Sequence, residues 1–95
     1  MLVLRELERE YFSLLRELGI ENREELRKKE YTSISLSRAK RKRSGKVYRW
    51  LILTGKREGK TRLIKNFYAD YEENHEKLRK LCSLYRAIKS LEGGM

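Results

Sequence analysis

The sequence predicts an α+β domain in which amphipathic helices accompany a small antiparallel sheet. Leucines and aromatic residues recur every three or four positions near both ends of the chain, which is typical of amphipathic helices. Between these segments, apolar and polar residues alternate in three short stretches, as in antiparallel strands. The 95 residues include 39% hydrophobic and 40% charged residues, so we expect residues 1–95 to form a single, highly charged domain.

The first element is a helix expected over about residues 2–18. Gly19 can end it by adopting a left-handed conformation. A short second helix is expected over about residues 23–29, with Asn22 and Glu25 as a capping box. The apolar stripe of the first helix consists of Leu4, Leu7, Tyr11, Leu14 and Leu18.

Three strands are expected over about residues 31–37, 47–54 and 61–68, with a turn at residues 44–45. A hairpin loop at residues 56–59 would turn Tyr48 and Trp50 toward the helices. The opposite, open face would then carry Arg49, Arg62 and Asn66. A one-residue change in this loop would exchange the faces and expose Tyr48 and Trp50 as stacking groups for unpaired bases.

The last element is a long helix expected over about residues 70–92. Asp70 and Glu73 form a second capping box in this prediction, and the acids of the first turn suit the positive end of the helix dipole. Its apolar face consists of Leu78, Leu81, Leu84, Tyr85, Ile88 and Leu91.

The excess positive charge of the chain lies within residues 38–65. This window holds twelve Lys or Arg residues and one acid, Glu58, whereas the rest of the chain holds twelve basic and thirteen acidic residues. The window therefore carries a charge of +11 and the rest of the chain −1, which together give the net charge of +10. Such a segregated charge favours a polyanionic partner, and double-stranded DNA is the expected one.

We expect three residues, Arg49, Arg62 and Asn66, to face a DNA groove, because guanidinium and amide groups suit base edges. The remaining cations are expected to anchor phosphates from both ends of the strands. They are Arg38, Lys40, Arg41, Lys42, Arg43, Lys46, Lys56, Arg57 and Lys60.

The sequence does not indicate an enzyme. No nucleophile-and-base pair stands out. One cysteine, Cys82, and one histidine, His75, give no zinc-site pattern, and Cys82 fits the apolar face of the last helix. We therefore expect no catalytic residue, no metal site and no cofactor.

Composition also bears on location and origin. No segment has the apolar length of a membrane span, the first ten residues contain acids, and one cysteine excludes an internal disulfide. These features predict a cytoplasmic protein without membrane contact, or one of the host cytoplasm if it is viral. The lack of Gln and Pro with abundant Glu, Lys and Arg is typical of thermophiles.

About half of the chain resembles the arm-type DNA-binding domain of tyrosine integrases, a three-stranded sheet packed on a helix. The resemblance rests on Gly45 to Trp50, Gly59-Lys60, and Phe67 ahead of Asp70 and Glu73. It implies that the sheet face enters the DNA major groove. The stretch from Gly45 onward also resembles small uncharacterised proteins of archaea and mobile elements, which adds no function. From the charge and the predicted sheet we expect a small DNA-binding protein, a transcription regulator or architectural factor of a thermophile's plasmid or virus.

Two alternatives remain open. The element order resembles the double-stranded RNA-binding domain, although that family begins its last helix with lysines and residues 69–73 are acidic here. The leucine stripes of the first and last helices also have coiled-coil-like spacing, so either helix could form a homodimer seam in a protein–protein assembly module. In one chain the same stripes could pack on each other and on the sheet.

Overall fold

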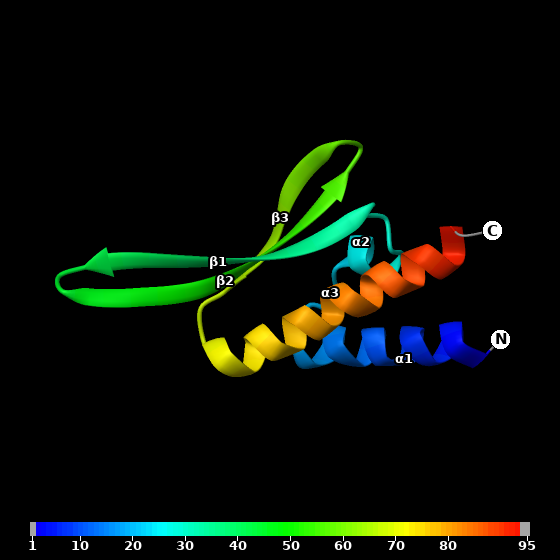
Figure 1. The fold of residues 1–95 in the computed structure, drawn as a ribbon, viewed down its shortest axis with the longest axis horizontal. Helices are drawn as coiled ribbons and strands as arrows, with labels where there is room; N and C mark the ends of the chain where they lie inside the picture. Colours follow the sequence, from blue (N-terminus) through cyan, green and yellow to red (C-terminus); the bar gives the residue numbers. More distant parts are fainter. Residues whose placement is uncertain (1, 94–95) are drawn as a thin grey trace.

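The computed structural model describes residues 2–93 and has the predicted α+β architecture. Helix α1 (Leu2–Glu17) is followed by a single-turn helix α2 (Glu24–Arg27). Strands β1 (Ser33–Arg43), β2 (Lys46–Arg57) and β3 (Lys60–Phe67) come next, and helix α3 (Tyr71–Gly93) closes the fold. In Figure 1, α1 and α3 run side by side in opposite directions below the sheet.

The three strands form one antiparallel sheet in the order β1-β2-β3, with β2 in the centre. Helices cover one face of this sheet, which contributes Ile34, Leu51, Leu53, Ile64 and Phe67 to the core. The opposite face, which we call the open face, has no buried hydrophobic side chain. The sheet therefore has one packed and one accessible side.

The core joins the helices to the sheet. The leucine stripes of α1 and α3 pack together within the chain. Most of their side chains are buried there, whereas Leu4 and Leu7 are partly buried and Leu91 is exposed. The Tyr11 hydroxyl donates to the Leu26 carbonyl (2.7 Å), and the Tyr85 hydroxyl donates to the Tyr31 carbonyl (2.6 Å). These buried bonds tie α2 and the start of β1 to the long helices.

Strands β1 and β2 are longer than the sequence predicted. We expected strands over 31–37 and 47–54, but β1 runs through the basic segment to Arg43 and β2 continues to Arg57. The turn at Ser44–Gly45 is confirmed, with both residues at positive φ (51° and 77°). Such two-residue turns match the strand twist, so a paired strand can continue up to them.

The predicted loop at 56–59 is wrong. The second hairpin turns at Glu58–Gly59 alone, with φ values of 53° and 77°, and Arg57 pairs with Lys60. A bulge then leaves Ile64 as an extra residue, because Thr54 pairs with Leu63 and Leu53 pairs with Lys65. This shift lets Ile64 and Phe67, three residues apart, both reach the core.

The helix ends also depart in part from prediction. Gly19 has φ 71°, and the N–H groups of Gly19 and Ile20 donate to the Arg16 and Leu15 carbonyls, as a glycine-terminated helix requires. Neither predicted capping box forms. Arg23 is the N-cap of α2 without a side-chain hydrogen bond.

At the start of α3, the Asn74 side chain donates to the Ala69 carbonyl (3.0 Å). Asp70 has a φ of 48°, whereas an N-cap residue normally has an extended conformation. The predicted pairing of Asp70 with Glu73 is therefore replaced by this link from Asn74 to Ala69.

Candidate nucleic-acid interface

The far halves of β1 and β2 form a two-stranded ribbon that projects beyond the helices (Figure 1). We call residues 38–50 the arm. Every arm residue is exposed except Ala39 and Trp50, which are half-buried. The arm gives the molecule its elongated dimensions of 53 × 28 × 20 Å.

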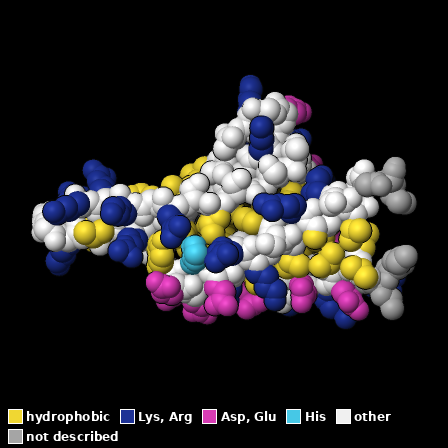
Figure 2. Space-filling view, viewed as in Figure 1, with side chains coloured by type: hydrophobic (Ala, Val, Ile, Leu, Met, Phe, Trp, Pro, Cys, Tyr) yellow, Lys and Arg dark blue, Asp and Glu magenta, His cyan; other side chains and the backbone are white. Residues whose placement is uncertain are grey.

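The arm carries strong, uncompensated positive charge. It contains seven of the predicted site residues and no acid, and among residues 2–93 none of these seven takes part in a salt bridge. Figure 2 shows Lys and Arg side chains along the arm, whereas Asp and Glu side chains gather over the helices. The seven are Arg38, Lys40, Arg41, Lys42, Arg43, Lys46 and Arg49.

The register divides these cations between the two faces of the ribbon. Lys40 lies opposite Arg49 on the face that continues from the core, and Arg43 lies opposite Lys46 on the open face. Like charges directly across a sheet are unfavourable by about 0.2–1 kcal/mol. Neither pair has a salt-bridge partner within residues 2–93, so an external anion would stabilise the arm.

The second cluster of predicted site residues lies at the β2–β3 hairpin, which points away from the arm in Figure 1. Its cations have acidic neighbours. Arg57 pairs with Glu30 (3.3 Å), and a hollow lined by Lys60 and Arg62 also includes Glu25 and Glu58. The cluster consists of Lys56, Arg57, Lys60 and Arg62, and its charge is partly neutralised within the chain.

The predicted trio of groove-facing residues does not share one surface. Arg49 pairs with Lys40 in the arm, and Arg62 pairs with Gly55 on the helix side of the sheet. Asn66 pairs with Ile52, half-buried on the open face. The assumed orientation was therefore wrong for β2 and for Arg62, whose faces are exchanged, whereas the bulge in β3 leaves Asn66 on the open face.

The side-chain packing around Gly55 explains this exchange. A Cβ atom at Gly55 would lie 2.5 Å from the Tyr31 ring, so the missing side chain lets Tyr31 cover this part of β2. Leu51 and Leu53, which share the face of Gly55, therefore point into the core. Tyr48 and Trp50 consequently lie on the open face, as in the alternative that the sequence left open.

Two cations that sequence analysis did not select extend the basic surface. A groove of about 410 Å³ between β1 and α3 is lined by Arg38, Arg79 and Arg86, and no acid lines it. His75, Arg79, Ser83 and Arg86 recur at helical spacing along α3, which is the signal that could have found them. Burial raises the pKa of Cys82 in this groove to about 11, so its thiol is not an activated nucleophile.

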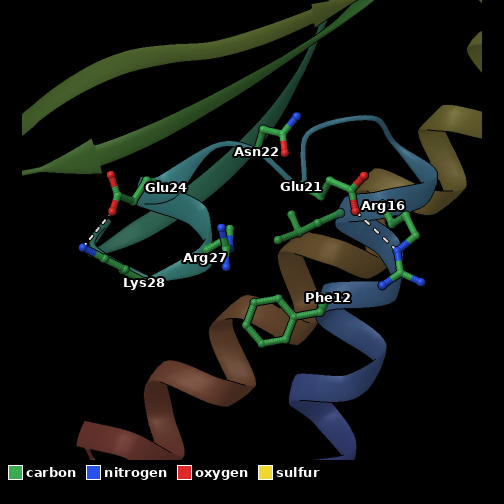
Figure 3. A pocket seen from close by; sticks show the side chains of 8 residues that line it. Phe12, Arg16, Glu21, Asn22, Glu24, Arg27 and Lys28 are labelled. Atoms are coloured by element: carbon green, nitrogen blue, oxygen red, sulfur yellow. Dashed lines mark hydrogen bonds and ion pairs between the residues drawn. The ribbon is translucent and has the colours of Figure 1, made fainter.

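A further hollow lies between α1, α2 and their connection, with a volume of about 580 Å³ (Figure 3). Four of the five charged side chains that line it form two ion pairs. Arg16 contacts Glu21 at 3.3 Å and Lys28 contacts Glu24 at 2.8 Å. The hydrogen bond and charge of Lys28 lower the pKa of Glu24. The members of each ion pair neutralise one another, and the two pairs lie apart in the hollow (Figure 3).

The structure adds two findings about ligands and membranes. Within residues 2–93, no three His, Cys, Asp or Glu side chains gather as a metal site would require. None of the helices in the same part of the chain combines the length and apolarity needed to cross a bilayer.

Comparison with protein-family models, curated proteins and solved structures gives no match to this chain.

Proposed function

We propose that the protein binds double-stranded DNA, with the arm lying in the major groove. The observation that carries this proposal is the arm itself, a two-stranded ribbon with seven cations, no acid and no internal salt bridge among the described residues. The major groove of B-DNA is about 12 Å wide and admits a two-stranded ribbon. Cations on both faces of the ribbon can then reach phosphates on both walls.

The shape of the arm favours DNA over duplex RNA. The major groove of A-form RNA is deep and narrow, so a ribbon of this kind cannot enter it. The groove between β1 and α3 supports the same proposal, because Arg79 and Arg86 continue the basic surface beyond Arg38. The proposed role is that of a non-catalytic regulator or architectural factor.

Affinity for matched duplex DNA and duplex RNA should be measured by fluorescence anisotropy across a salt series. We expect tighter binding to DNA and a slope of log K against log salt of roughly −4 to −6, since several arm cations would displace counterions. Lys42→Ala should weaken binding to all duplex sequences alike and reduce the slope by roughly 1. Arg49→Ala should also alter sequence preference, because its guanidinium can reach base edges from the arm.

Arg9→Ala is the matched control, because Arg9 is an exposed cation of α1 outside the basic window. It should leave both affinity and slope unchanged. Equal losses from Arg9→Ala and Lys42→Ala, or tighter binding to duplex RNA, would contradict the proposal.

A further inference from the structure

Two aromatic rings, Trp50 and Tyr68, pack against each other where the arm joins the sheet, and Tyr48 lies on the same face of β2 as Trp50. The rings of Trp50 and Tyr68 are 5.9 Å apart between centroids and tilted by 37°. Tyr68 directly follows β3 and is 69% exposed, and Tyr48, two residues before Trp50 on the same face, is 52% exposed. Buried aromatic groups stabilise a core, but these rings are accessible to a ligand.

The neighbour of Trp50 on β1 is small. Ala39 lies opposite Trp50 and is the one residue of the segment 38–43 that is not Lys or Arg. A longer side chain at this register position could cover the indole, whereas a methyl group leaves room beside it. Trp50 is thus half-buried, with only a methyl group opposite it on β1.

The charge around these rings distinguishes between possible occupants. Cations lie at both ends of the open face, with Arg41 and Arg43 in the arm and Lys56 near the second turn. From Thr32 to Ala69 the only acid is Glu58. A second copy packed face to face would bring like charges together, whereas a nucleic-acid strand supplies phosphates for the cations and flat bases for the rings.

We infer that the open face binds unpaired bases of a DNA strand, stacked on Trp50, Tyr68 and Tyr48. The preferred ligand is then a duplex with a single-stranded extension, with the duplex held by the arm and the extension laid on the open face. This inference rests on the proposed duplex function of the arm for its choice of ligand. Stacking itself is tolerant of sequence, because every base has a flat face.

Trp50 is the only tryptophan, so its fluorescence reports directly on this site. The protein should be titrated with an oligothymidylate of about 12 nucleotides, a blunt duplex, and the same duplex with a thymidine tail. We expect the oligothymidylate and the tailed duplex to quench Trp50, and the tail to tighten duplex binding.

Tyr68→Ala should weaken oligothymidylate binding roughly 5- to 150-fold, the range that corresponds to the loss of one stacking contact. Binding to the blunt duplex should change by less than about twofold. Tyr68→Phe keeps the ring and should retain affinity. Leu91→Ala, which removes an exposed apolar side chain from α3, is the control and should have no effect.

Unchanged Trp50 fluorescence with oligothymidylate, or equal losses from Tyr68→Ala on the blunt duplex and on the oligothymidylate, would overturn the inference. Salt-sensitive binding of the blunt duplex that depends on Lys42 would still support the function of the arm. Quenching by oligothymidylate without any binding of the blunt duplex would support stacking on the open face and contradict that function.

Discussion

Charge is balanced in the helical regions and unbalanced in the arm. Residues 2–30 and 71–93 contain twelve acids and twelve Lys or Arg residues, and each of the five salt bridges among the described residues includes a residue from these ranges. The arm contains seven cations, no acid and no salt bridge of its own. Most core residues lie in the helical ranges, whereas no residue from Lys40 to Arg49 is buried. Stability therefore arises mainly in one region, and the other has charge available for a ligand.

The largest expected effect is on stability and separates the two regions. Leu81→Ala should lower the free energy of unfolding by about 2–5 kcal/mol, because Leu81 is fully buried and its truncation leaves a cavity. Lys42→Ala should change it by less than about 0.5 kcal/mol, because Lys42 is exposed and has no salt bridge among the described residues. Urea unfolding followed by circular dichroism measures both values. A loss from Lys42→Ala as large as that from Leu81→Ala would mean that the arm is part of the folding core.

The next expected effect is a loss of stability at alkaline pH, which arises from a residue of the core. Burial raises the pKa of Tyr85 to about 12 and that of Cys82 to about 11. A group whose pKa is raised by folding contributes stability that is complete below its unfolded pKa and is lost as pH rises through the folded value. For Tyr85 this window runs from about pH 10 to about pH 12, and we expect a loss of about 1–3 kcal/mol across it.

Unfolding in urea at several pH values below and within this window tests the expectation. Tyr85→Phe is the matched variant, because it removes the titrating hydroxyl. It should cost about 1–3 kcal/mol at neutral pH by leaving the Tyr31 carbonyl without its donor, and should then decline less with pH. Equal declines for wild type and Tyr85→Phe would assign the alkaline loss to other groups.

The sequence predicted the order of elements because periodicity and turn residues are local signals. It did not predict the orientation of the sheet, because the alternative faces of β2 are both largely apolar and the choice depends on contacts distant in sequence. The Tyr31 ring packs over Gly55, and the bulge at Ile64 breaks the alternation in β3. Gly55 alone is a local sign of a close contact in β2, but its partner Tyr31 lies in a distant segment, and the bulge has no signature within β3.

For the candidate site too, the sequence did not predict contacts between residues that are distant in sequence. Charge segregation identified the arm cations, since net charge is a property of composition. The sequence did not show that the second cluster lies near Glu25 and Glu30, because these acids come from another element. Nor did it bring Arg79 and Arg86 next to Arg38, because that groove exists only after α3 packs beside β1.

The smallest predicted effect is the sharpest test of the comparison, because stability and binding should move in opposite directions. Arg49→Glu replaces the repulsion between Lys40 and Arg49 with an attractive cross-strand pair, which should raise the free energy of unfolding by about 0.2–1 kcal/mol. The same change removes two units of positive charge from the arm and should weaken duplex DNA binding. Urea unfolding and anisotropy on one protein sample measure the two effects together. A destabilised fold in Arg49→Glu would show that Arg49 has a structural role. A stabilised fold with unchanged affinity for duplex DNA would show that the positive charge of the arm does not contribute to DNA binding.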